Sequence, residues 1–150
     1  MTLQRRKVFL DTSVIFAAVL SPEGGARKLL HLAEAGFINL IVGSNVLREC
    51  DTVVRRKAPS SLPMLAQLLA AGRVETSSAP SRKQIAAARA FVKYGPDAHI
   101  LGEAIGARPD WFVTHDKEHL LKVRTERRLA FKIGTPGDLI RALKEDFKLP

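Results

Sequence analysis

The sequence predicts an α/β fold, a three-layer α/β/α sandwich with a mostly parallel central sheet. Short apolar runs bounded by polar or turn residues alternate along the chain with longer segments of helical periodicity. Such alternation is typical of a parallel sheet covered by helices on both faces. The 150 residues are enough to bury a substantial core, and no linker, repeat or low-complexity segment divides them. We therefore expect a single domain over residues 1–150.

The predicted strands are short and apolar. The first strand, Lys7–Asp11, ends abruptly in the polar residues Asp11, Thr12 and Ser13. Because Asp is disfavoured in strands, its place at the end of a buried run calls for a reason. The remaining predicted strands are Asn39–Val42, Val74–Thr76, Trp111–Thr114 and Ala130–Ile133.

Caps and breakers set the limits of the predicted helices. Either Ser44 or Asn45 is expected to cap the helix after the second strand, and Ser81 and Asp116 are expected to cap two later ones. Thr135-Pro136-Gly137-Asp138 combines a cap, an early proline and an acid, a typical helix start. The expected helices are Val14–Leu20, Ala26–Ala35, 45–57, Met64–Ala71, Arg82–Tyr94, Asp97–Ile105, Lys117–Val123 and 136–147.

The net charge of +9 favours a polyanionic partner, either nucleic acid or an acidic protein segment. The positive charge is concentrated in Arg5-Arg6-Lys7, in Arg55-Arg56-Lys57 and between Lys122 and Lys132. The single cysteine, Cys50, excludes an internal disulfide and fits a small buried side chain in a reducing compartment. No apolar stretch approaches the ~20 residues of a membrane span, and polar residues interrupt the apolar N-terminal segment. We expect a cytoplasmic protein without membrane contact.

Four carboxylates from separate segments are expected to share one cleft. Asp11 ends the first strand and Asp116 follows the Trp111–Thr114 strand, so parallel pairing brings both to the same edge of the sheet. Glu49 can lean back over that edge from the helix that follows the second strand. Asp97 opens a helix that runs back towards the start of the Trp111–Thr114 strand, so its helix begins on the same side.

The other acids fit this cleft less well, and simpler roles compete even for the chosen four. Asp97 and Asp116 also suit helix caps, and Glu49 suits an ordinary solvated helix position; Asp11 is the hardest to explain in such terms. The acids expected to lie elsewhere are Asp51 and Glu103, on other helix faces, Asp110, at the opposite sheet edge, and Glu118, in a first helical turn.

Clustered carboxylates repel one another unless a cation compensates their charge. An all-oxygen ligand set favours a hard ion, Mg²⁺ or Mn²⁺, over zinc. A basic protein with such an ion in an acidic cleft suits phosphodiester hydrolysis, with a metal-activated water as nucleophile and Lys and Arg side chains on the flanking phosphates.

The pattern resembles PIN-domain nucleases, in particular the VapC-like toxins of toxin–antitoxin pairs, over about Lys7 to Leu143. The matching motifs are Val8-Phe9-Leu10-Asp11-Thr12-Ser13, Ser44-Asn45-Val46-Leu47-Arg48-Glu49, Pro96-Asp97-Ala98-His99-Ile100-Leu101 and 111–120 (WFVTHDKEHL). The resemblance implies an endoribonuclease that uses Mg²⁺ or Mn²⁺, is commonly dimeric, and is held inactive by a cognate antitoxin protein. It assigns the metal-site and catalytic carboxylates to Asp11, Glu49, Asp97 and Asp116.

The resemblance also matches Ser13 and Thr114 to small polar residues that support the carboxylates. His99 and His115 stand near places where relatives often carry further acids, which leaves the number of metals open. We interpret His115 as a partly exposed loop residue. Val14–Leu20 and Ala26–Ala35 are candidates for a dimer or antitoxin face, although core packing explains them equally well.

Three other functions compete with this interpretation. A haloacid-dehalogenase-like phosphatase needs a second Asp two residues after the first, where this chain has Ser13. A response-receiver domain needs a phospho-accepting Asp with further acids that this chain does not supply. The serious rival is a PIN-fold RNA-binding module with weak or no catalysis, which metal-dependent RNA cleavage by the purified protein would distinguish.

Overall fold

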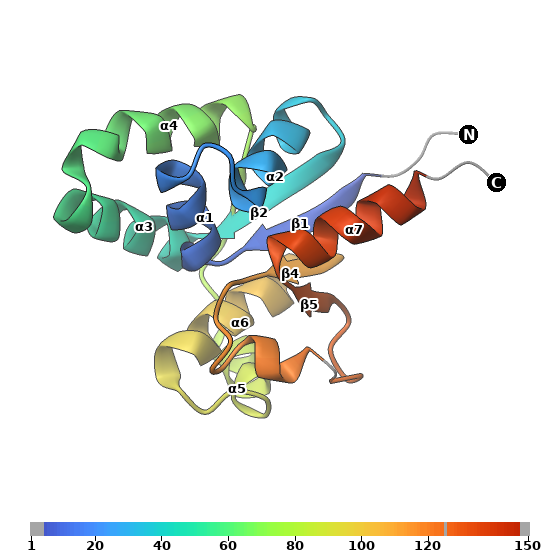
Figure 1. Ribbon diagram of the computed structural model, residues 1–150. Helices are drawn as coiled ribbons and strands as arrows, with labels where there is room; N and C mark the ends of the chain where they lie inside the picture. Colours follow the sequence, from blue (N-terminus) through green and yellow to red (C-terminus); the bar gives the residue numbers. More distant parts are fainter. Residues whose placement is uncertain (1–4, 125, 148–150) are drawn as a thin grey trace.

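Five short parallel strands form the centre of the computed structural model, which describes residues 5–124 and 126–147 (Figure 1). The strands are β1 (Arg6–Leu10), β2 (Ile38–Gly43), β3 (Glu75–Ser77), β4 (Trp111–Val113) and β5 (Lys132–Gly134), in the spatial order β3-β2-β1-β4-β5. All four pairings are parallel, and Phe9 of the central strand lies opposite Ile41 of β2 and Phe112 of β4. The predicted parallel sheet is thus confirmed.

Helices cover both faces of this sheet. The helices are α1 (Thr12–Leu20), α2 (Gly25–Glu34), α3 (Ser44–Lys57), α4 (Leu62–Ala71), α5 (Arg82–Arg89), α6 (Gly95–Ala107) and α7 (Pro136–Asp146), with 3-10 turns η1 (Pro59–Ser61) and η2 (Leu121–Val123). Figure 1 shows α5 and α6 below the sheet and α1, α2, α3 and α4 above it, which confirms the predicted three layers, and α7 packs against α2. No helix in the described ranges is both long and apolar enough to cross a membrane.

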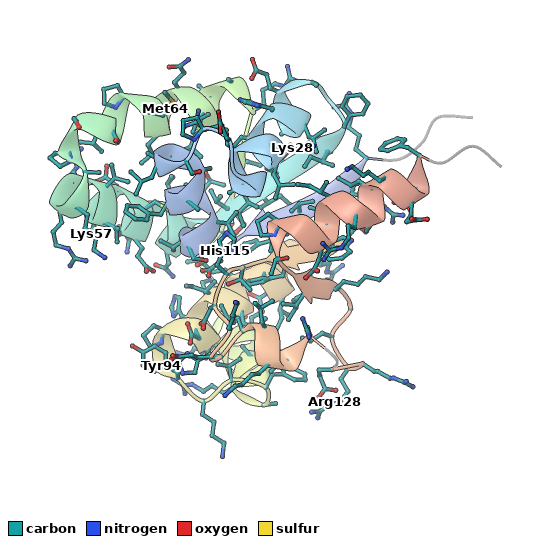
Figure 2. All side chains as sticks on the ribbon, in the orientation of Figure 1. Lys28, Lys57, Met64, Tyr94, His115 and Arg128 are labelled. Atoms are coloured by element: carbon teal, nitrogen blue, oxygen red, sulfur yellow. The ribbon has the colours of Figure 1, made fainter. Side chains whose placement is uncertain are left out.

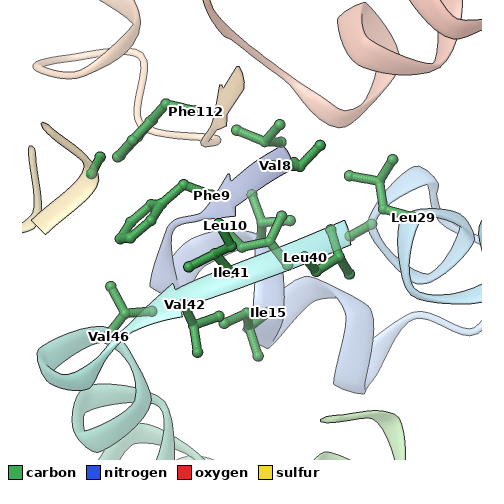
Figure 3. Close-up of a cluster of buried hydrophobic side chains, with 14 of the residues drawn as sticks. Val8, Phe9, Leu10, Ile15, Leu29, Leu40, Ile41, Val42, Val46 and Phe112 are labelled. Carbon is green, nitrogen blue, oxygen red and sulfur yellow. The ribbon is translucent and has the colours of Figure 1, made fainter. Parts of the chain in front are cut away.

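Because both faces of the sheet are covered, the central strands are apolar on both sides. Figure 3 shows Val8, Phe9 and Leu10 of β1 beside side chains of β2, α1, α2 and β4. The Phe9 ring stacks on Phe112 with centroids 5.5 Å apart. The buried sides of α1 and α2 also belong to this core, so core packing accounts for most apolar residues of Val14–Leu20 and Ala26–Ala35, whereas Leu20 is exposed. Cys50 is buried as predicted, and burial raises the pKa of its thiol to about 12.

The strand order creates a switch point between β1 and β4. From β1 the chain moves through α1 and α2 to β2, whereas from β4 it moves to β5 on the other side. Two neighbouring strands whose connections diverge leave a crevice outside their carboxyl ends, where ligands bind in open α/β sheets. Asp11 directly follows β1 at this point, and Thr114 directly follows β4.

The predicted caps at Ser81 and Thr135 are confirmed, each with a complete capping box. Other helix boundaries were wrong. The helix that starts at Arg82 ends at Arg89 rather than Tyr94, because Tyr94 is extended as the N-cap of α6, which begins at Gly95. The segment Lys117–Val123 is a turn followed by η2 rather than an α-helix, since the Leu121 N–H donates to the carbonyl of Asp116 and closes a wider turn.

The cap of α3 was also predicted wrongly. The N-cap is Gly43, which has no side chain to offer, and a carboxylate from α6 takes over this role. Glu103 is 1% exposed, and its Oε2 accepts hydrogen bonds from the Asn45 N–H (3.1 Å) and from the Ser44 hydroxyl (3.4 Å). An anion here also interacts favourably with the helix dipole. A Cβ on Gly43 would lie 2.3 Å from the Glu103 carboxyl carbon, so glycine is required for space.

We expect Gly43→Ala to lower the free energy of unfolding by about 1–3 kcal/mol, because the new methyl group displaces the Glu103 carboxylate from the start of α3. Urea unfolding measures this loss. Gly137→Ala is the matched control, because a Cβ there has no neighbour closer than 3.6 Å. That variant should be unchanged or more stable by up to about 1 kcal/mol. Equal stability of Gly43→Ala and the natural sequence would contradict the role assigned to Gly43.

Candidate carboxylate site

Asp11 is the most completely satisfied acid at the switch point. Its side chain caps α1 by accepting from the Thr12 N–H (2.8 Å), and its other oxygen accepts from the hydroxyls of Thr114 (2.7 Å) and Ser13 (3.0 Å). Burial raises the pKa of Asp11, the three hydrogen bonds oppose that rise, and the charge of Asp116 adds to it. Asp11 is therefore both a helix cap and a buried carboxyl held in one orientation.

The same hydroxyls connect the loop after β1 to the loop after β4. Thr114 Oγ1 accepts from the Asp116 N–H (3.0 Å), and Ser13 Oγ accepts from the His115 N–H (3.1 Å). Ser13 and Thr114, which the sequence assigns to support of the carboxylates, thus both contact Asp11 and shape the loop that carries Asp116.

We expect Thr114→Val to lower the free energy of unfolding by about 1–3 kcal/mol, because it removes a buried hydroxyl on which Asp11 and the Asp116 amide depend. Thermal or urea unfolding at neutral pH measures the change. Thr52→Val is the matched control, since the exposed Thr52 hydroxyl donates only to the carbonyl of Arg48 on its own helix. The control should change by less than about 0.5 kcal/mol. Similar losses in both variants would refute the proposed importance of this network.

Asp97 lies in the first turn of α6 and faces the other acids. Burial is the largest cause of a pKa raised to about 6, and the charges of Asp116, Asp11 and Glu49 raise it further, while His119 lowers it. Glu49 reaches the site from α3; partial burial of its carboxyl and the charge of Asp11 raise its pKa. Each predicted carboxylate therefore acts electrostatically on at least one of the others.

His119 is a site residue that the sequence interpretation missed. Its Nδ1 lies 2.9 Å from Asp97 Oδ2 and 3.6 Å from Asp116 Oδ2. Asp116 Oδ1 accepts from the N–H groups of Glu118 and His119, which curls the chain and brings the imidazole over the acids. The sequence does contain one indication of this role, which is the spacing of three residues between Asp116 and His119. If Asp116 caps the turn that follows it, His119 returns to the same side of the chain as Asp116.

The remaining acids and histidines lie elsewhere. Asp51 pairs with Arg55 on the surface of α3, and Asp110 accepts from the Lys7 N–H at the opposite edge of the sheet. Glu118 and His115 are exposed in the loop after β4, and Figure 2 shows His115 there. His99 lies near Glu103, whose pKa is raised by burial, and the charge of His99 partly opposes that rise.

The residues present fit a divalent cation. Donor atoms of Asp97, Asp116 and His119 lie within 4.8 Å of one another. Asp97 Oδ2 is buried and accepts no hydrogen bond from the described residues, so its contact with His119 is electrostatic. A cation here would relieve the repulsion that raises the pKa of Asp97. Carboxylates favour Mg²⁺ or Mn²⁺, and an imidazole in the set would shift the preference towards a transition metal.

We expect Asp97→Asn to stabilise the protein in chelator at about pH 8, because it removes one of the mutually repelling charges. The folded pKa of about 6 exceeds the ordinary 3.8, so the folded state binds the proton more tightly. Stability from this group is therefore present at low pH and is lost as the pH rises towards about 6 and above. The gain in Tm on substitution should be largest near pH 8 and small near pH 4.

Thermal unfolding at both pH values tests this expectation, with Asp51→Asn as the control for loss of a surface carboxylate. Mn²⁺ should raise the Tm of the natural sequence more than that of Asp97→Asn. A variant that is less stable than the natural sequence near pH 8 would show that Asp97 is not under repulsion.

Together the fold and the site define an α/β protein with clustered carboxylates at the switch point of a parallel sheet. Residues 7–118 match the sequence model of the PIN domain, and the chain belongs to this family, whose members are generally nucleases. A search of curated proteins gives no match.

Two solved structures share the fold. One is VapBC2 from Rickettsia felis bound to a DNA fragment from its promoter, with a TM-score of 0.62, 16% identity, and coverage of 85% of this chain and 98% of that chain. The other is PAE2754 from Pyrobaculum aerophilum, with a TM-score of 0.64, 15% identity, and coverage of 93% of this chain and 90% of that chain.

Proposed function

We propose that this chain is a divalent-metal-dependent endoribonuclease and the toxin of a toxin–antitoxin pair. The observation that carries the proposal is the convergence of Asp11, Glu49, Asp97 and Asp116 at one switch point in a protein of net charge +9. Membership of the PIN domain family and a fold shared with VapBC2 support it. We take residues 1–150 as one cytoplasmic PIN domain.

In the proposed reaction Asp11, Glu49, Asp97 and Asp116 hold Mg²⁺ or Mn²⁺, and His119 is an additional candidate ligand. When bound, the ion would supply an activated water and would neutralise charge on the scissile phosphate. Thr114, Ser13 and the Thr12 N–H fix the Asp11 carboxylate in one rotamer, so that little reorganisation is needed when the ion binds. Lys and Arg side chains near the site bind the flanking phosphates. In-line hydrolysis leaves 5′-phosphate and 3′-hydroxyl ends.

Glu49→Gln and Asp51→Asn form a matched pair of variants on α3 for the test of this activity. We expect Glu49→Gln and Asp11→Asn to reduce RNA cleavage by at least about 100-fold, because each removes a carboxylate of the metal site. Asp51→Asn should retain activity, since Asp51 pairs with Arg55 at the surface. Cleavage of labelled RNA with Mg²⁺, with Mn²⁺ and with EDTA is measured, together with end-group analysis of the products.

Two results would contradict the proposal. Products with 2′,3′-cyclic phosphates would exclude attack by water. Tight RNA binding without cleavage by any variant would favour the RNA-binding module instead.

The proposal includes two protein partners. We propose a homodimer and a cognate antitoxin, encoded beside this chain, that inhibits cleavage. Light scattering of the purified protein tests the dimer. Co-purification with the neighbouring gene product, followed by the cleavage assay, tests the antitoxin.

A further inference from the structure

An exposed aromatic ring stands beside the carboxylate site. Tyr94 is 55% exposed although one face of its ring is stacked on the imidazole of His119, with centroids 5.3 Å apart and an interplanar angle of 16°. The imidazole in turn contacts Asp97 and Asp116. A continuous path of contacts therefore runs from an open aromatic face to the carboxylates.

The backbone fixes the position of this ring. Tyr94 is the N-cap of α6, and its carbonyl accepts the first hydrogen bond of the helix from the Ala98 N–H (2.9 Å). Val92, two residues earlier, is buried, and Asp97 follows three residues later in the same helical turn. Apart from its chain neighbours, a Cβ on Gly95 would meet no atom within 4 Å, so the backbone next to Tyr94 is open to solvent. The ring is thus anchored at its backbone and accessible at its face.

Exposed lysines stand on the segments that carry Tyr94 and His119. Lys93, Lys117 and Lys122 are exposed, and none of them forms an ion pair with another described residue. Phe91 and Lys122 line a groove of about 400 Å³ on the same lobe. Figure 2 shows Tyr94 at the turn where α6 begins, in the lobe formed by α5, α6 and the loop after β4. Exposed aromatic rings among lysines are typical of single-strand binding surfaces.

We propose that Tyr94 is the stacking platform for an unpaired nucleobase of the RNA substrate. The base would lie on the open face of Tyr94, extend the stack of Tyr94 on His119, and place a neighbouring phosphodiester over the carboxylates. This inference rests on the proposed function and adds the substrate class, single-stranded RNA. In a duplex both faces of a base are covered by its neighbours, so a paired strand cannot use this platform. Because every base has a π-face, the platform selects for an unpaired state rather than for a sequence.

The test uses binding, so that it does not depend on cleavage. The probe is a short oligouridylate with a single 2-aminopurine, whose fluorescence falls when the base stacks on an aromatic ring. In the Asp11→Asn background, we expect the probe to be quenched on binding and Tyr94→Phe to preserve both quenching and affinity. Tyr94→Ala should abolish the quenching and weaken binding by about tenfold.

Phe37→Ala is the matched control, because Phe37 is about equally exposed (51%). Phe37 precedes β2 and therefore lies at the amino-terminal ends of the strands, opposite the carboxylate site. It should change neither quenching nor affinity. A probe of the same length made only of abasic nucleotides, which has no base to stack, should bind the natural protein and Tyr94→Ala equally well. This readout separates stacking from a merely structural role of the tyrosine ring.

Quenching and affinity retained in Tyr94→Ala, or no quenching with Tyr94 present, would overturn the inference. Equal quenching by a probe annealed to its complement would overturn the claim for single strands. If the Tyr94-dependent quenching holds but the natural sequence cleaves no RNA, the platform stands and the proposed nuclease activity fails. If the protein cleaves RNA and Tyr94→Ala leaves KM unchanged, the role of Tyr94 is refuted and the proposed nuclease activity is retained.

Discussion

The site depends on one constraint, the need to satisfy a carboxyl group buried at the end of the central strand. A buried carboxylate is costly unless hydrogen bonds compensate for lost water. Asp11 meets this need with a backbone N–H of α1, a hydroxyl two residues away and the Thr114 hydroxyl after β4. These bonds tie the ends of β1 and β4 together. The loop after β4 then starts from a fixed point and carries Asp116 and His119 to the same crevice.

Two buried acids on α6 show how environment separates stabilising from functional charge. Glu103 faces backbone N–H groups at the start of α3, where the helix dipole favours an anion. Asp97 faces other carboxylates and has a pKa raised to about 6. Burial raises the pKa of both carboxyls, but donors at the start of α3 hold Glu103, whereas neighbouring carboxylates repel Asp97 until a cation or a proton arrives. Repulsion among several carboxylates in one crevice is characteristic of functional sites.

The sequence alone predicted the features that depend on residues close together in the chain. A buried strand that ends in Asp11, the capping boxes at Ser81 and Thr135, and the edge on which strand ends meet all follow from spacing and residue type. The errors arose where distant parts of the chain overrode local preference. Glu103 caps α3 from another helix, so the residues near Gly43 could not predict which side chain provides the cap. The turn after Asp116 buries Leu120 and Leu121 and leaves His119 at the site. The sequence favoured a helix over Lys117–Val123, and helical periodicity does not predict this arrangement.

The exposure of Tyr94 follows from the same topology. The crossover that carries the chain from β3 to β4 must begin α6 at the carboxyl edge of the sheet, so that Asp97 can face Asp11. An N-cap is extended, and the residue there leaves the helix surface towards solvent. A small polar residue would suit this place best for stability. An aromatic ring there contributes nothing to the cap and exposes apolar surface, yet it covers the imidazole that contacts the acids. A flat partner on its open face would gain stacking and bury apolar surface, and a nucleobase is the partner that we propose.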